Sequence, residues 1–250
     1  MTALVASFPA ERAHTYAFLR DARGTAHVFL TADVDATALR DARARSNAEI
    51  SYVSYVVKAA ADVLAQYPQA RSTLRDGLLP RVVTLSDVTA KVLFDKDFDG
   101  TRCVAAGTIG APDKASVAVI QSQIDHYKTA PIDADGPFAP LWELRRIPLW
   151  AVRLIYNLLL GKPERRARFQ GTFSVTSVGH RDVRSILPMI ATPIGLGMGR
   201  IAATPVVRDG DIVVAPQFTL SLAFDHRVLD GALAADLLTE IKLKLETWDS

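Results

Sequence analysis

The chain has 250 residues, of which 49% are hydrophobic and 22% charged, and its formal net charge is +2. This length allows one large domain or two small ones with a sizeable core, and so small a charge excludes the electrostatic signature of a nucleic-acid-binding protein. The single cysteine, Cys103, excludes an internal disulfide and any CxxC metal site.

The N-terminal part has no basic region followed by a long apolar one, so a secretion signal is not expected and a cytoplasmic location fits best. Helical patterns over residues 13–23 and 35–45 flank residues 26–34, which are rich in β-branched and aromatic residues and predict a strand. Residues 50–67 are apolar at helical spacing and end before a proline, which predicts a long core helix.

Residues 81–94 predict one or two strands, and residues 101–107 predict another. The acidic segment 95–100 between them resembles a calcium loop but lacks the glutamate that such a loop requires, so we interpret it as a hairpin turn. Cys103 lies in an apolar run and is expected to fill the core rather than act as a nucleophile. A helix is expected within residues 111–128.

The character of the chain changes over residues 129–168, where prolines precede a basic, aromatic and aliphatic stretch. Within it, residues 149–160 are apolar on nearly every side, but twelve residues are too few to span a bilayer. This segment could lie on a membrane surface, line a substrate tunnel or form a buried helix, and the buried helix is the default interpretation.

Residues 170–178 alternate as a strand does. The glycine triplet within residues 194–199 lacks the spacing of a dinucleotide fingerprint and is set aside as a motif. Asp209-Gly210 lies between the apolar runs 201–207 and 212–214, which predicts a β-hairpin.

The C-terminal strand ends at a histidine. In Gln217–Gly231, which reads QFTLSLAFDHRVLDG, apolar residues alternate through Phe224, and the same alternation would point His226 into apolar surroundings. A helical pattern follows from Leu233. Such a histidine near Asp230 is suited to act as a base, but residue types alone favour a helix-capping Asp230 beside a core histidine.

Two motifs favour a catalytic role for His226 over a structural one. Asp225–Gly231 resembles the DHRVxDG signature of the dihydrolipoamide acyltransferases of 2-oxo acid dehydrogenase complexes, and chloramphenicol acetyltransferases share its HxxxDG core. Residues 171–179 (GTFSVTSVG) resemble the GTFTISNLG strand of the same family. Residues 25–43 and 50–68 resemble its first strand and helix and its long core helix, so the chain is identified as a member of this family.

The resemblance implies an α/β fold of the chloramphenicol acetyltransferase type, a mixed β-sheet with helices packed on one side. It implies a homotrimer with the active site at the subunit interface. Residues 1–250 are expected to be a single catalytic domain with an atypical insertion at about residues 129–168, and without a lipoyl or subunit-binding domain. Residues 247–250 end with two polar residues and contain no aliphatic anchor, so we expect a discrete trimer rather than a large hollow core.

The resemblance also assigns roles to residues. His226 matches the general base, Thr176 the hydroxyl that stabilises the oxyanion, and Asp230 the aspartate that holds the loop through an arginine. Ser177 and Gly231 are expected to contact substrate. The implied reaction moves an acyl group from a coenzyme A or acyl-carrier-protein thioester to a thiol, amine or alcohol, with no metal and no covalently bound cofactor.

The sequence departs from the family pattern in that Thr176 replaces a serine and Ser177 replaces a common asparagine. A non-catalytic structural or assembly subunit is therefore the alternative, but retention of the histidine, the aspartate and the hydroxyl favours an enzyme. For the insertion, our hypothesis is a cover over the acceptor side of the channel, with a pocket for a hydrophobic acyl chain. A basic helix on a membrane surface is the rival and is not favoured.

Overall fold

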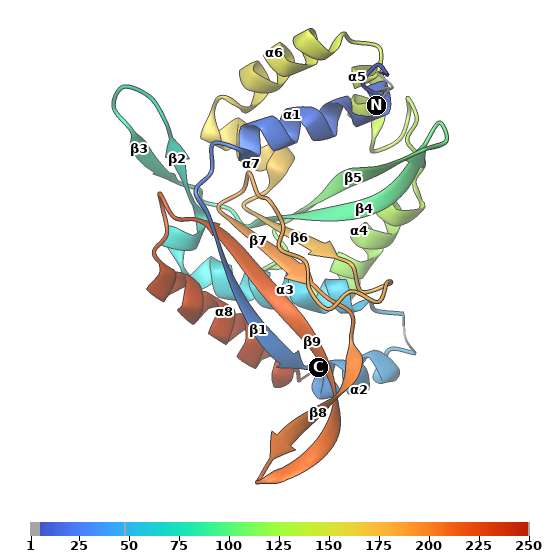
Figure 1. The fold of residues 1–250 in the computed structure, drawn as a ribbon, viewed down its shortest axis with the longest axis vertical. Coiled ribbons are helices and arrows are strands. Elements are labelled where there is room, and N and C mark those ends of the chain that lie inside the picture. The colour runs from blue at the N-terminus through green and yellow to red at the C-terminus, as the bar shows by residue number, and fades with distance from the viewer. Residues whose placement is uncertain (1–5, 48, 250) are drawn as a thin grey trace, which may run out of the picture.

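A mixed sheet of seven strands forms the centre of the protein in the computed structural model, which describes residues 6–47 and 49–249. The strand order is β1-β9-β7-β6-β4-β5, and β8 pairs with the first half of β9 (Figure 1). Strands β4, β6 and β7 run parallel to one another and the other pairs are antiparallel. The strands are β1 (His27–Asp35), β4 (Thr89–Phe98), β5 (Thr101–Gly110), β6 (Phe173–Ser177), β7 (Ile194–Met198), β8 (Ala202–Arg208) and β9 (Asp211–Asp225).

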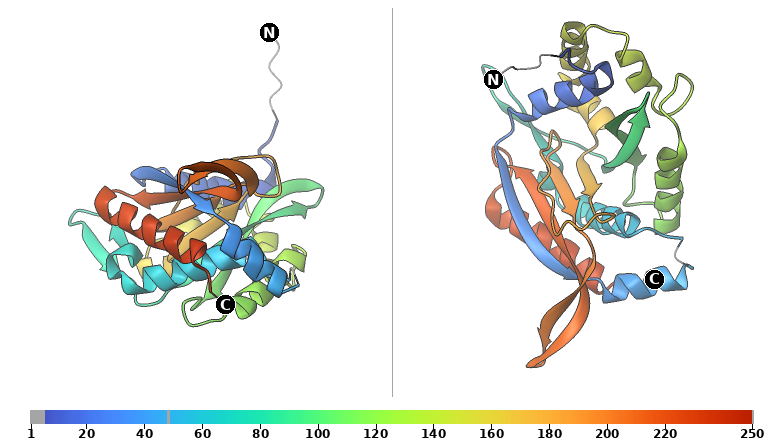
Figure 2. Two further views of the ribbon diagram at one scale, coloured as in Figure 1. Left: turned by 90° about the horizontal axis from the view of Figure 1, so that it is seen from below. Right: turned by 45° about the vertical axis from the view of Figure 1, so that its right-hand side comes forward.

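Helices cover the sheet, with α3 and α8 against one face (Figure 2). A second, two-stranded sheet of β2 (Ser72–Arg75) and β3 (Arg81–Thr84) lies apart from the main one. The α-helices are α1 (Ala13–Ala22), α2 (Thr37–Arg45), α3 (Tyr52–Gln66), α4 (Val117–Thr129), α5 (Ala139–Leu144), α6 (Leu149–Leu160), α7 (Pro163–Gln170) and α8 (Gly231–Glu246). This arrangement confirms the expected fold class.

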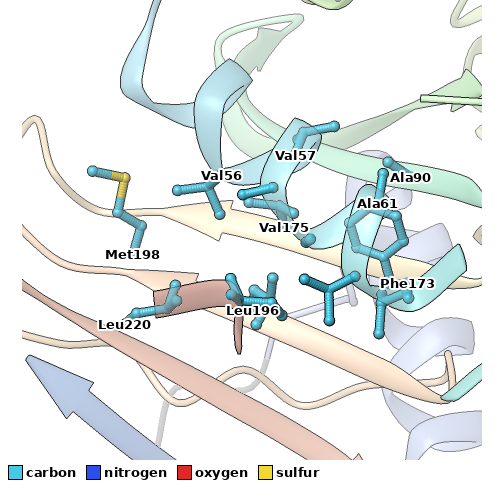
Figure 3. Packing of buried hydrophobic residues seen from close by; sticks show 14 of the residues in the cluster. Val56, Val57, Ala61, Ala90, Phe173, Val175, Leu196, Met198 and Leu220 are labelled. Carbon is cyan, nitrogen blue, oxygen red and sulfur yellow. The ribbon is translucent and has the colours of Figure 1, made fainter. Parts of the chain in front are cut away.

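The main core lies between α3 and the sheet, as Figure 3 shows. Val56 and Val57 of α3 meet Phe173 of β6 and Leu196 of β7, and all four are completely buried. Burying one such side chain contributes about 1.5–3 kcal/mol, so this layer carries much of the stability. Ser51 caps α3 by accepting a hydrogen bond from the backbone nitrogen of Ser54. The predicted core helix is therefore confirmed.

The opposite face of β6, β7 and β9 is covered by the loop between β6 and β7. A Cβ atom at Gly197 would clash with the carbonyl oxygen of Ile186, and one at Gly199 would clash with the carbonyl oxygen of Arg184. The hydroxyl of Ser221 on β9 donates to the same Ile186 oxygen. The glycine triplet, which had no assigned role, thus lets this loop lie directly on the sheet, and β7 is a strand that the sequence analysis did not predict.

Helices α5 and α6, which lie within residues 129–168, form a separate layer together with α1. Val152 of α6 is completely buried in a small cluster with Ala13 and Ala17 of α1. The opposite side of α6 is open, because Trp150 and Leu158 are 70% and 67% exposed. The default expectation of a buried helix is therefore wrong for this side of α6. No helix in the described ranges is long and apolar enough to cross a membrane.

The hairpin predictions are met in different ways. Asp209 and Gly210 both have positive φ (52° and 91°), as a two-residue hairpin turn requires, so this prediction is confirmed. The predicted turn over residues 95–100 is shorter in the structure, since β4 continues to Phe98 and only two residues separate it from β5. Cys103 is buried in a cluster with Phe98, as expected of a core residue.

Candidate active site

His226 lies in the turn that follows β9. Its backbone nitrogen donates to the carbonyl oxygen of Ala26 (2.9 Å), and the carbonyl oxygen of Asp225 accepts from the backbone nitrogens of Val228 and Leu229 (3.0 Å each). The side chain of His226 is 46% exposed, and its ring centroid lies 5.4 Å from that of Phe224. The expectation that the ring points into apolar surroundings is therefore wrong for a single copy, because the strand ends one residue earlier and the turn directs the ring outward.

Asp230 stands at the N-cap position of α8. Its Oδ1 lies 4.0 Å from Nδ1 of His226, and its side chain is 92% exposed. The side chain makes no capping hydrogen bond, although its position in the chain is that of the N-cap. The structure pairs Asp230 with no arginine among the described residues, so the expected loop-holding ion pair of Asp230 is not present within one copy.

The arginine of this turn is instead held by Asp225. Oδ1 of Asp225 accepts from the backbone nitrogen (3.1 Å) and Nε (2.8 Å) of Arg227, and its Oδ2 accepts from Nη2 of Arg227 (2.6 Å). Asp225 is buried, and burial by itself raises the pKa of this carboxyl group. The hydrogen bonds from Arg227 outweigh burial and lower the pKa below its ordinary value. This clamp closes the turn on either side of His226, whereas the resemblance to the family implied an ion pair at Asp230 instead.

The structure places the other three predicted site residues in different environments. Thr176 is partly exposed near the end of β6, on the face opposite the buried Val175. Ser177 uses its hydroxyl to accept from the backbone nitrogen of Gly179 (3.1 Å). Gly231 begins α8, and a Cβ atom there would meet nothing within 4 Å, so its backbone approaches no other part of the chain closely.

The sheet register separates Thr176 from His226 within one chain. Thr176 pairs with Gly197, which pairs with Ser221, so Thr176 is level with a residue five positions before His226. At about 3.3 Å per residue along a strand and about 4.8 Å between strands, the two residues lie roughly 15–20 Å apart. A single chain therefore does not bring the predicted base and the predicted oxyanion donor together.

A cavity of about 260 Å³ lies beside the His226 turn, and Arg227 forms part of its wall. The end of α6 and the start of α7 contribute Leu160 and Pro163, so residues 129–168 reach this region. The remaining wall is largely polar: Asp21, Gly24, Thr25, Thr73, Leu74, Arg75, Asp76, Gly161 and Arg166. Three arginines and two aspartates do not suit a hydrocarbon chain, so this cavity does not fit the hypothesis of a pocket for a hydrophobic acyl group.

A half-buried lysine lies on the face of the sheet that also carries Thr176. Lys91 of β4 pairs in register with Ser174 of β6, and its ammonium group donates to Gln170 (2.9 Å) and lies 4.8 Å from the ring centroid of Phe18. Burial lowers its pKa to about 8. Gln170 in turn donates to the hydroxyl of Tyr156 in α6. The sequence gives no signal for Lys91, because the alternation of residues in β4 does not predict that α1 and α7 cover this face of the sheet.

In the described part of the chain, no group of three or more histidine, cysteine, aspartate or glutamate side chains is placed to hold a metal ion. The chemically capable groups near the turn are the imidazole of His226, the carboxylate of Asp230 and the guanidinium of Arg227. This set suits proton transfer and the binding of an anionic group.

Comparison with protein families shows a match to the model described as 2-oxoacid dehydrogenases acyltransferase (catalytic domain), over residues 9–89 and 161–250. Among curated proteins, the dihydrolipoyllysine-residue acetyltransferase component of the pyruvate dehydrogenase complex of Bacillus subtilis is 28% identical over 228 residues. The match covers 86% of this chain and 44% of that protein. The chain thus spans about half the length of the curated relatives it matches.

Solved structures are similar in fold. A probable dihydrolipoamide acetyltransferase from Listeria monocytogenes superposes with a TM-score of 0.73 at 20% identity, covering 100% of this chain and 97% of the other. A chloramphenicol acetyltransferase superposes with a TM-score of 0.54 at 14% identity, covering 98% of each chain.

Proposed function

The chain belongs to the family of 2-oxoacid dehydrogenase acyltransferase catalytic domains, and on that premise we propose that it transfers an acyl group between coenzyme A and a dihydrolipoyl thiol. The names of the curated relatives favour the dihydrolipoyl group over the amines and alcohols that the sequence leaves open. Residues 1–250 then act as one catalytic domain, in which residues 129–168 are an insertion outside the common pattern.

In this proposal His226 acts as the general base. It takes the proton from the attacking thiol, and the resulting thiolate adds to the thioester carbonyl carbon. The hydroxyl of Thr176 donates a hydrogen bond to the oxyanion of the tetrahedral intermediate. When the intermediate collapses, the carbon–sulfur bond to the leaving thiol breaks and the histidine returns its proton to that thiolate. No acyl-enzyme forms, which agrees with the burial of Cys103.

The site is proposed to form between two copies of the chain in a homotrimer. The separation of roughly 15–20 Å between His226 and Thr176 supports this, because a base and an oxyanion donor must both lie within about 3 Å of one small reacting group. A second copy would then supply Thr176 to the exposed ring of His226.

The observation that carries the proposal is the constraint on the His226 turn. Its backbone is bonded to Ala26, and the Asp225–Arg227 clamp encloses it, while the imidazole itself is left open. A histidine with a fixed backbone and a free ring is placed to exchange protons with a substrate. The alternative, a non-catalytic assembly subunit, has no use for an open imidazole in a closed turn.

The test is acyl transfer from acetyl-CoA to dihydrolipoamide, measured as release of coenzyme A. We expect His226→Ala to lose on the order of a hundredfold or more in rate while keeping its thermal midpoint. Thr176→Ser should keep substantial activity, whereas Thr176→Val, which has nearly the same shape but no donor, should lose on the order of a hundredfold. Wild-type protein without transfer activity would favour the assembly subunit, and equal rates for the Ser and Val variants would exclude Thr176 as the donor.

A further inference from the structure

Helix α6 presents an apolar stripe that no other described part of the chain covers. Trp150, Leu154 and Leu158 are spaced four residues apart, which places them on one side of the helix, and they are 70%, 55% and 67% exposed. The other side of the helix is anchored, since Val152 is completely buried against Ala13 and Ala17. The stripe therefore has a fixed orientation, and Figure 1 shows that α6 lies at one end of the molecule.

The segment that carries this stripe is positively charged, although Arg145, Arg146 and Arg166 form ion pairs. Residues 139–170 contain seven basic and two acidic residues, a net charge of +5, whereas the whole chain carries +2 and the remainder thus −3. Lys162, Arg165 and Arg168 are exposed, and none of them pairs with a described acidic side chain. The charge is thus concentrated on the segment that carries the exposed apolar residues.

A groove between α1 and α6 runs beside the stripe. Its volume is about 230 Å³, and its walls include Arg20 of α1 and Arg153 and Asn157 of α6. Asp21 also lines the groove; its Oδ1 accepts a hydrogen bond from Arg166 (3.0 Å), whereas its Oδ2 is buried and accepts none from the described residues. At 100° per residue, Arg153 and Asn157 lie directly beside Trp150 and Leu154 on the helix surface. Two guanidinium groups and an amide next to an apolar stripe match the phosphate and acyl boundary of a phospholipid layer.

We propose that α6 docks this protein on the surface of an anionic lipid bilayer. Trp150, Leu154 and Leu158 enter the boundary between headgroups and acyl chains, and Arg20 and Arg153 hold a headgroup phosphate in the groove. This inference reaches beyond the acyl transfer proposed above and does not depend on it. A two-fold contact between the stripes of two copies is a poorer occupant, because it would bring two segments of charge +5 together.

Vesicle flotation of the purified wild-type assembly tests the proposal. We expect binding to vesicles of mixed phosphatidylcholine and phosphatidylglycerol, weakened by added salt, and little binding to phosphatidylcholine alone. Replacing both Trp150 and Leu154 with aspartate should lower the bound fraction about tenfold or more. The matched control replaces Ile212 and Val214, which are 79% and 74% exposed, with aspartate in the β8–β9 hairpin at the opposite end of the molecule (Figure 1). This control should bind as wild type does.

Tryptophan fluorescence locates the contact. Trp150 is the most exposed of the three tryptophans, so insertion should shift the emission of the wild type to shorter wavelength. Trp150→Phe should still float with anionic vesicles but lose most of this shift. Absence of flotation, or flotation that the double aspartate variant retains, would overturn the proposal. Self-association without lipid that the same variant abolishes would assign the stripe to a second copy instead.

Discussion

Mixing two inactive variants tests whether the active site is shared between copies. One variant carries His226→Ala and the other Thr176→Val, so each lacks one of the two proposed groups. Within one chain these residues lie roughly 15–20 Å apart, too far for both to reach one thioester carbonyl. A working site in the mixture must therefore take His226 from one copy and Thr176 from its neighbour.

The expected magnitude follows from random assembly. In an equal mixture, a site has an intact histidine in about half of cases and, independently, an intact threonine in about half. About one quarter of all sites then hold both groups, and every trimer that contains both variants has one such site among its three. The isolated mixed trimers should therefore recover about one third of wild-type activity. Each variant alone should show on the order of one hundredth of it or less.

The assay is coenzyme A release from acetyl-CoA with dihydrolipoamide as acceptor. The two variants carry different affinity tags and are produced together, so that mixed assemblies can be isolated with both tags. Wild-type chains with the same two tags, produced together in the same way, set the full rate. Mixed assemblies no more active than the two parents would refute the shared site, and a wild-type protein that remains monomeric in solution would refute its premise.

Two further predictions concern stability. Burial lowers the pKa of Lys91 to about 8, so between this value and about 10.5 the unfolded chain holds more protons than the folded one, and stability should rise with pH. Lys91→Met should therefore be more stable than wild type at pH 7, by up to about 3 kcal/mol in denaturant unfolding. This difference in stability should shrink as the pH rises towards about 10.5. A difference that does not depend on pH would show that the lysine charge is not its cause. Gly197→Ala should cost about 1–3 kcal/mol, because the new methyl group displaces the Ile186 carbonyl from the sheet. Gly110→Ala, where the methyl group meets nothing within 4 Å, is the control in the same thermal melts, and equal losses would rule out the close approach as the reason.

Local patterns in the sequence determined most of the secondary structure. The alternation of Phe218 to Phe224, the helical spacing of residues 50–67 and the Asp209-Gly210 turn each depend on neighbours in the chain, and each was predicted correctly. The family was also readable, because the DHRVLDG and GTFSVTSVG motifs are contiguous. Strand β7 was missed because Gly195 and Gly197 remove the alternation from which a strand is recognised.

Only the tertiary structure decided which groups meet. Arg227 pairs with Asp225 rather than Asp230 because the turn after β9 folds the guanidinium back over the strand end. Residue types two positions before and three positions after the arginine do not specify this direction. The sequence of α6 is apolar on nearly every side, so it does not specify which side is covered. The structure shows that α1 packs against Val152 and leaves Trp150 exposed. The register of three strands, a long-range property of the sheet, places Thr176 and His226 far apart, and it is this separation that points to a site made by two copies.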